Sequence, residues 1–227
     1  MGDLATQRTR VMERIQAAER VAGRPLGSVQ LLAVSKTHPV ERIQELAQAG
    51  QRRFGENYLQ EALAKFTALA GLGLEWHFIG PIQSNKTRAL AAHFAWVQSV
   101  DRVKVAERLN AQRPVNLPRL NVCLEVNVSG EATKSGVAPE KLIELAQAVA
   151  MLPRLRLRGL MTIPAPLTPG NDPRAPFRLL RELFQDLQRR GLELDTLSMG
   201  MSDDLEAAIA EGATLVRIGT ALFGVRA

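Results

Sequence analysis

The segment Leu31-Leu32-Ala33-Val34-Ser35-Lys36 decides the fold and also places the first group that could carry chemistry. Its apolar run predicts a buried strand that ends on a lysine. Pro39 and the helical pattern from Val40 onward complete a unit of strand, loop and helix. Because ligands meet parallel α/β proteins at the carboxyl ends of the strands, this unit puts Lys36 where a ligand could reach it.

Lys36 has two interpretations at this point. An amine held against apolar walls is partly desolvated, which disfavours its ammonium form, and the neutral amine can attack a carbonyl to form a Schiff base. In the second interpretation Lys36 only extends its charged end into solvent from the strand end. Lys36 alone favours the second interpretation, so the rest of the chain has to decide.

The alternation of an apolar strand and an amphipathic helix recurs along the whole chain. The strand-like segments cover 31–36, 53–55, 75–80, 95–100, 120–128, 155–163, 194–200 and 214–218. A predicted helix follows each of them except the last, and an extra helix over 3–22 precedes the first. Such alternation implies parallel strands with right-handed crossovers, and eight of them can close. We therefore predict a single α/β domain over 1–227, a (β/α)8 TIM-type barrel with an extra N-terminal helix.

The charge of the chain first suggests a nucleic-acid partner. The 227 residues carry a formal net charge of +6 and the sequence pI is about 10.1. However, the arginines are scattered over predicted helices rather than gathered in one tract, and aromatic residues make up only 4% of the chain. Platforms for stacking bases are therefore scarce, and we expect no specific nucleic-acid binding.

Cysteine and histidine usage argues against a metal site. The single Cys123 cannot form an internal disulfide or a cysteine-rich zinc site, which fits a reducing compartment. His77 alternates with Trp76 and Phe78, so we predict a histidine inside the core or barrel, and no metal. No apolar run is long enough to span a membrane, and charges occupy the N-terminal region where a signal peptide needs apolar residues. We expect a cytoplasmic protein.

Two segments near the C-terminus predict a phosphate site. Ser202 follows the seventh predicted strand, and Arg217, Gly219 and Thr220 end the eighth. Backbone amides and hydroxyls at such positions suit a phosphate dianion, although the Ser202-Asp203 pair alone also resembles a simple helix cap. Barrel closure brings the eighth strand beside the first, and hence beside Lys36. A lysine next to a phosphate cradle suggests pyridoxal 5'-phosphate or a sugar-phosphate aldehyde.

Three further features carry weaker expectations. Asn57, after the second predicted strand, could equally cap the next helix or touch a ligand. Tyr58, the only tyrosine, is expected to pack rather than to act as a base. The Pro- and Gly-rich loop over 164–176 follows a strand end, where such loops often cover a ligand.

Five segments of the chain form a recognisable set: Ala33-Val34-Ser35-Lys36, Phe54-Gly55-Glu56-Asn57-Tyr58, Trp76-His77-Phe78-Ile79-Gly80-Pro81-Ile82-Gln83-Ser84-Asn85-Lys86, Ser198-Met199-Gly200-Met201-Ser202-Asp203-Asp204 and Arg217-Ile218-Gly219-Thr220. Together they closely resemble the YggS/PROSC family of pyridoxal phosphate homeostasis proteins, and the likeness covers essentially the whole chain. The resemblance implies a barrel like the N-terminal domain of alanine racemase, with pyridoxal 5'-phosphate as cofactor.

The resemblance also implies roles for individual residues. Lys36 would hold the cofactor as a Schiff base, while Ser202, Gly219 and Thr220 would bind its phosphate. Arg217 would face the pyridine nitrogen, and because a guanidinium only donates, it would keep that nitrogen unprotonated and the ring a poor electron sink. The other interpretation of Arg217 is a salt bridge in the barrel mouth. For Asn57 and Met161 we predict contact with the cofactor.

The same resemblance favours a binding protein over an enzyme. Racemases of this barrel type carry a following β domain that supplies a second acid–base residue, and we expect no such domain after Thr220. The leading hypothesis is a monomeric carrier in vitamin B6 homeostasis, without catalytic residues, that holds the cofactor reversibly and could hand it to apo-enzymes. The alternatives are a weak amino-acid racemase or a Schiff-base aldolase, a basic nucleic-acid module, and a barrel that binds no ligand.

Overall fold

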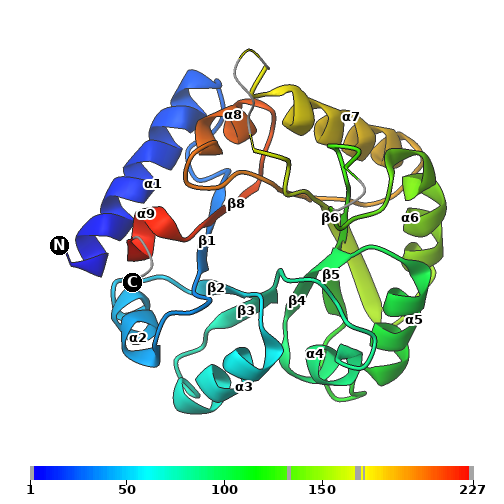
Figure 1. The fold of residues 1–227 in the computed structure, drawn as a ribbon, viewed down its shortest axis with the longest axis horizontal. Helices are drawn as coiled ribbons and strands as arrows, with labels where there is room; N and C mark the ends of the chain where they lie inside the picture. The colour runs from blue at the N-terminus through cyan, green and yellow to red at the C-terminus, as the bar shows by residue number, and fades with distance from the viewer. Residues whose placement is uncertain (1–2, 132–133, 167–169, 171, 225–227) are drawn as a thin grey trace.

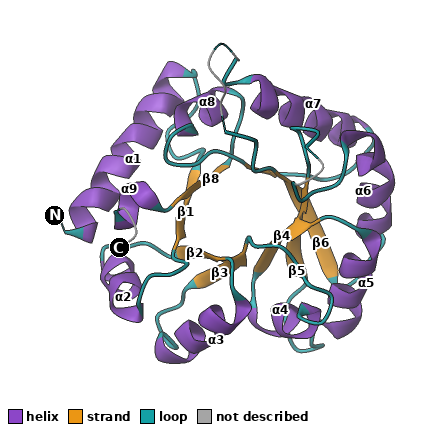
Figure 2. Ribbon diagram, in the orientation of Figure 1, coloured by secondary structure: helices purple, strands orange, loops and turns teal. Residues whose placement is uncertain are grey.

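Eight parallel strands form a closed barrel in the computed structural model, which describes residues 3–131, 134–166, 170 and 172–224. Each strand pairs with the next along the chain, and β1 pairs with β8 to close the ring (Figures 1 and 2). The strands are β1 (Gln30–Val34), β2 (Arg53–Glu56), β3 (Glu75–Phe78), β4 (Trp96–Val100), β5 (Leu120–Glu125), β6 (Leu155–Met161), β7 (Thr196–Ser198) and β8 (Leu215–Ile218). The predicted fold class is confirmed.

The helices surround this ring, as Figure 2 shows. They are α1 (Leu4–Val21), α2 (Val40–Gln48), α3 (Leu59–Ala68), α4 (Thr87–His93), α5 (Val103–Gln112), a 3-10 turn η1 (Pro139–Lys141), α6 (Leu142–Ala150), α7 (Ala175–Arg189), α8 (Leu205–Ala210) and α9 (Thr220–Phe223). The extra N-terminal helix α1 packs against α2, α8 and α9. Its apolar stripe of Leu4, Val11, Ile15 and Ala18 is buried there.

Several expected boundaries were wrong: β1, β3 and β6 each end two residues earlier than predicted, at Val34, Phe78 and Met161. Three further differences concern α9, β5 and β7. A short helix, α9, does follow β8, whereas the sequence pattern predicted none after the last strand. β5 ends at Glu125 rather than Val128, because Val126 leaves the ladder and forms an isolated bridge with Val137. β7 is only three residues long, because the chain turns away at Gly200, whose φ of 94° lies in the left-handed region that glycine adopts without strain.

Apolar side chains are buried in two layers. The main core lies between the strands and the helices and includes Phe54, Leu90, Phe94, Leu109 and Leu180. Smaller clusters are formed by Leu32, Ile79 and Leu215, and by Trp96, Cys123 and Met161. None of the helices in the described part of the chain is long and apolar enough to cross a membrane.

Candidate functional site

A cavity of about 200 Å³ opens where the chain leaves β1, β7 and β8 at their carboxyl ends. Its lining contains Val34, Lys36, His38, Met201, Ser202, Asp203, Arg217, Gly219, Thr220 and Gly224. Five of the seven residues singled out in the sequence therefore share one cavity. The pairing of β1 with β8 brings them together, because Ala33 lies opposite Ile218 in the register.

Lys36 follows the end of β1 and is half-buried. The backbone before it is fixed to the next strand, since Ser35 donates from its N–H to the carbonyl of Gly55 over 3.0 Å. The turn continues through His38, whose N–H donates to the carbonyl of Ser35 over 3.1 Å. Lys36 is thus carried on a short and hydrogen-bonded turn at the rim of the cavity.

Ser202 joins the loop after β7 to the start of α9. Its hydroxyl accepts a hydrogen bond from the N–H of Ala221 over 3.3 Å, and its carbonyl accepts one from Arg14 of α1 over 3.1 Å. The N-cap of α8 is Asp204, so Ser202 and Asp203 do not cap that helix. Ser202 instead lines the cavity together with Gly219 and Thr220.

Arg217 projects into the barrel and is only 3% exposed. Nη1 donates to the hydroxyl of Ser198 over 2.8 Å, and Nη2 donates to the carbonyl of Thr162 over 2.7 Å. Burial lowers the pKa of the guanidinium to about 10, although the nearby Glu125 opposes this shift. Arg217 is therefore still a cation at neutral pH, and it supplies the cavity with a fixed positive charge that can only donate.

A directed chain of hydrogen bonds runs from Arg217 through the barrel. Ser198 donates to Gln98 Oε1 over 2.6 Å, and Gln98 Nε2 donates to His77 Nδ1 over 2.8 Å. His77 Nε2 then donates to the carboxylate of Glu75 over 2.9 Å. Burial lowers the pKa of His77, so its ring is neutral and the two neighbours fix its tautomer.

The prediction that His77 is an interior histidine is confirmed. Its side chain is 1% exposed and stacks on Trp96 with ring centres 5.1 Å apart. Among the residues that the structure describes, histidine, cysteine, aspartate and glutamate side chains form no group of three that could hold a metal ion.

Asn57 and Met161 do not line the Lys36 cavity in the part of the chain that the structure describes. Met161 is fully buried beside Trp96 and Cys123. Asn57 does not cap α3, whose N-cap is Tyr58, and its buried Oδ1 has no hydrogen-bond partner among the described residues. A Cβ at Gly80 would lie 2.3 Å from the carbonyl oxygen of Asn57, so the absence of a side chain at Gly80 sets the position of Asn57.

Two expectations from the sequence need correction or addition. Tyr58 was expected to pack, but it is 56% exposed at the N-cap position of α3, just after the end of β2. His38 was missed: it lines the cavity and stacks on Phe223 of α9 with ring centres 4.3 Å apart. The signal was its position in the loop after β1, two residues beyond Lys36.

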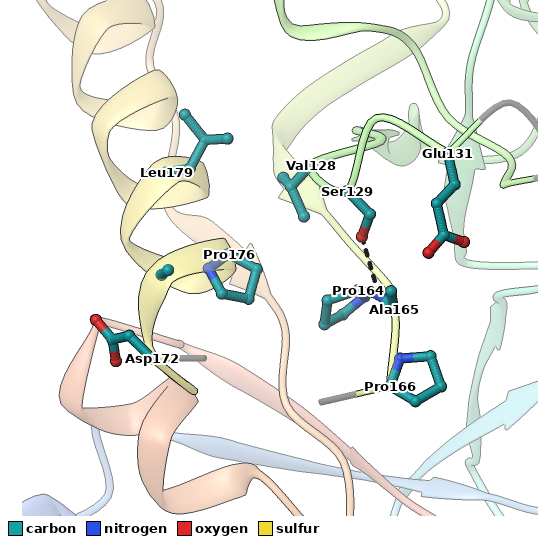
Figure 3. A pocket seen from close by; sticks show the side chains of 10 residues that line it. Val128, Ser129, Glu131, Pro164, Ala165, Pro166, Asp172, Pro176 and Leu179 are labelled. Carbon is teal, nitrogen blue, oxygen red and sulfur yellow. Dashed lines mark hydrogen bonds between the residues drawn. The ribbon is translucent and has the colours of Figure 1, made fainter. Parts of the chain in front are cut away.

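A wider cavity of about 530 Å³ lies beside the loops that follow β5 and β6 (Figure 3). Its lining includes Val128, Ser129 and Pro164, and helix α7 contributes Leu179. The two loops are tied together, since Ala165 donates from its N–H to Ser129 Oγ over 2.9 Å. The expected covering loop over 164–176 lies partly outside the described residues, at 167–169 and 171.

Known proteins resemble this chain over nearly its whole length. Residues 7–227 match the family described as alanine racemase, N-terminal domain. The chain is 63% identical over 226 residues to a pyridoxal phosphate homeostasis protein of Pseudomonas aeruginosa, covering 100% of this chain and 97% of the relative. It is 53% identical over 232 residues to the protein of that name from Escherichia coli strain K12, covering 100% and 98%.

A solved structure extends the likeness to a ligand-bound relative. PipY of Synechococcus elongatus PCC7942, solved with PLP bound, superimposes with a TM-score of 0.79 at 42% identity, covering 92% of this chain and 100% of PipY. The family match, the identities to the relatives and the shared fold agree. The chain therefore belongs to the YggS/PROSC family of pyridoxal phosphate homeostasis proteins.

Proposed function

We propose that this chain binds pyridoxal 5'-phosphate through Lys36 and holds it for vitamin B6 homeostasis without turning over a substrate. The observation that carries the proposal is the single cavity that gathers an amine, two hydroxyls and a buried guanidinium. When bound, the cofactor supplies an aldehyde that reacts with a primary amine, together with a phosphate dianion and a pyridine ring.

The residues present fit such a group. Ser202 and Thr220 offer hydroxyl donors for phosphate oxygens, and Gly219 lets the backbone approach closely. Lys36 faces the same cavity from the neighbouring strand end. At the end of β2, the buried Asn57 Oδ1 is an acceptor that has no donor among the described residues, but Asn57 does not line this cavity, so its contact with the cofactor remains a prediction from the sequence. The contact of Met161 remains a prediction from the sequence.

Arg217 is compatible with a holding role and with racemisation, and it argues against the carbanion chemistry of enzymes that pair the ring nitrogen with a carboxylate. Its two hydrogen bonds to Ser198 and Thr162 fix the guanidinium in the barrel. Because arginine remains protonated and only donates, a ring nitrogen placed opposite it stays unprotonated. A neutral pyridine withdraws fewer electrons than a pyridinium paired with a carboxylate. Reversible storage of the cofactor requires no such electron withdrawal.

The names of the relatives also favour homeostasis over turnover. Delivery of the cofactor to apo-enzymes, a monomeric state and a cytoplasmic location stay predictions from the sequence.

The test is the visible absorption spectrum of the purified protein, followed by borohydride reduction and mass spectrometry of tryptic peptides. We expect a yellow protein whose pyridoxyl adduct maps to Lys36 and disappears in Lys36→Ala. Lys104→Ala, which removes an exposed lysine of α5, is the matched control and should keep the adduct. A protein that stays colourless and unmodified after incubation with the cofactor overturns the proposal. Steady turnover of an amino acid overturns its non-catalytic part.

A further inference from the structure

Lys65 of α3 is a buried cation just behind the Lys36 turn. Its side chain is 4% exposed, and Nζ donates to Glu56 Oε1 over 2.7 Å, to Glu61 Oε1 over 2.5 Å and to the carbonyl of Ser35 over 2.7 Å. These bonds satisfy all three ammonium donors. Since apolar residues of similar volume often stabilise a fold as well as a buried ion pair does, stability alone does not account for this arrangement.

The same group of residues holds the peptide bonds on both sides of Lys36. The carbonyl of Ser35, in the peptide group that precedes Lys36, accepts from Lys65. The N–H of Thr37, in the peptide group that follows Lys36, donates to Glu61 Oε1 over 2.6 Å. We call Glu56, Glu61 and Lys65 the α3 clamp. It fixes the path of the backbone on both sides of the Lys36 Cα.

Glu56 completes the clamp from the end of β2. It is fully buried, and its Oε1 accepts from the hydroxyl of Ser35 over 2.6 Å as well as from Lys65. Ser35 is therefore held through both its side chain and its carbonyl. The clamp joins two neighbouring strand ends, β1 and β2, to one helix.

Thr37 shows that this backbone path needs support. Its φ is 66°, and it is the one residue other than glycine with a positive φ in the described ranges. A β-branched residue in the left-handed region is strained and persists only where its surroundings enforce the conformation. The strained residue is next to Lys36 and its N–H bonds to the clamp.

We propose that the α3 clamp positions Lys36 for covalent attachment of the cofactor, with Lys65 as the positioning residue. This inference rests on the proposed function of Lys36. In the attachment, the Lys36 nitrogen forms a double bond to the aldehyde carbon, and its two protons leave with the aldehyde oxygen as one water molecule. The clamp contacts only the Lys36 side of the cavity, after β1 and β2. Ser202, Gly219 and Thr220, which would bind the phosphate, lie on the other side, after β7 and β8.

The test separates attachment from phosphate binding. Full-length Lys65→Met, freed of cofactor, is mixed with pyridoxal 5'-phosphate, and the rate of attachment is followed by the change in absorbance. Inorganic phosphate is titrated separately by calorimetry. We expect attachment to slow by about 10- to 100-fold, the effect of a small displacement of a reacting group, with the affinity for phosphate unchanged within about twofold.

Arg113→Met is the matched control. Arg113 is another buried cation, and it donates to the carbonyls of Ala91, Phe94 and Pro118 at the amino-terminal end of β4 and β5. This variant should unfold more easily but attach the cofactor at the wild-type rate. An equal loss of rate in Arg113→Met would show general destabilisation and overturn the clamp.

A second pair of variants decides the question if Lys65→Met does not fold. Glu61, 28% exposed in its side chain, is replaced by alanine or by glutamine. Glu61→Ala should slow attachment, and Glu61→Gln, which keeps an oxygen acceptor for Thr37, should recover most of the rate. If Lys65→Met and Glu61→Ala both attach the cofactor at the wild-type rate, the clamp proposal is overturned and the proposed function of Lys36 still stands. Absence of attachment in the wild-type protein overturns the proposed function as well.

Discussion

The guanidinium of Arg217 donates a hydrogen bond to the hydroxyl of Ser198 over 2.8 Å, and both side chains are buried inside the barrel. Ser198 passes its own hydrogen to Gln98, so it accepts from one partner and donates to the other. Every hydrogen bond from Arg217 to Glu75 therefore points in one direction. A change at Ser198 leaves partners on both sides unsatisfied.

Ser198→Ala should accordingly destabilise the protein. It removes the acceptor for Arg217 Nη1 and the donor for Gln98 Oε1, and each buried group left without a partner costs about 1–3 kcal/mol. The free energy of unfolding in urea measures the loss. Thr9→Ala is the control, because its hydroxyl bonds to the carbonyl of Ala5 on the exposed face of α1 and the change should stay within about 0.5 kcal/mol. If Ser198→Ala and Thr9→Ala lower the free energy of unfolding equally, the hydrogen bonds of Ser198 do not stabilise the barrel.

Glu125 should make stability fall as the pH rises. Burial, assisted by Asp101, raises the pKa of its carboxyl from 4.5 to about 7, although Arg217 opposes the shift. Between these two values the folded protein holds a proton that the unfolded chain has lost, so the free energy of unfolding decreases as the pH rises through this window. Because the side chain in Glu125→Gln cannot ionise, its free energy of unfolding should not show this decrease.

The stability of Glu125→Gln relative to wild type should therefore increase between pH 5 and pH 8. The gain should reach about 2–3 kcal/mol, because each tenfold difference in proton affinity between the folded and the unfolded chain corresponds to about 1.4 kcal/mol. Urea unfolding of the cofactor-free proteins at both pH values measures it. Glu140→Gln, at an exposed position, should show no such increase. A constant difference between Glu125→Gln and wild type would show that Glu125 ionises normally.

Arg14 of α1 should support the proposed phosphate site at Ser202. It donates to the carbonyl of Ser202 and forms an ion pair with Glu206 at 2.8 Å. The pair is exposed, so Arg14→Ala should change stability by at most about 1 kcal/mol, while the affinity for inorganic phosphate falls by about two- to fivefold. Titration calorimetry makes the measurement. Arg10→Ala, an exposed arginine of the same helix, should bind phosphate like the wild type. Identical affinities in all three proteins would exclude this supporting role.

Cys123 should be inert toward thiol reagents in the folded protein. The side chain is fully buried, and burial raises the pKa of the thiol to about 12, so almost no thiolate forms at pH 8. An aromatic disulfide reagent should release one equivalent of chromophore only in denaturant. Rapid release from the native protein would mean that the barrel opens readily around β5.

The order of strands explains how much of the site could be predicted from the sequence. Eight repeats of strand and helix implied a closed barrel, and closure alone puts the Lys36 turn beside Arg217, Gly219 and Thr220. Local patterns were sufficient because each of these residues follows or ends a strand. The ligand contacts of Asn57 and Met161 depend on side-chain direction, which a strand pattern does not determine.

The contacts of Lys65 could not be predicted from the sequence, although its burial could. Leu59, Ala62 and Lys65 are spaced by three residues and are the buried residues of α3, so the spacing already placed a cation on the apolar stripe. Its partners could not be inferred, because Glu56 belongs to a strand and Ser35 to a different loop. Such contacts depend on tertiary packing rather than on local periodicity.

The seam between β1 and β8 has a consequence for the order of events during synthesis. Of the eight strands, β1, which precedes the amine of Lys36, leaves the ribosome first, and β8, which carries the guanidinium, leaves it last. A nascent chain that stops after α8 contains Lys36 and Ser202 but has no neighbour for the free edge of β1 and no complete cavity. Cofactor binding therefore reports that translation has passed β8 and that the ring has closed.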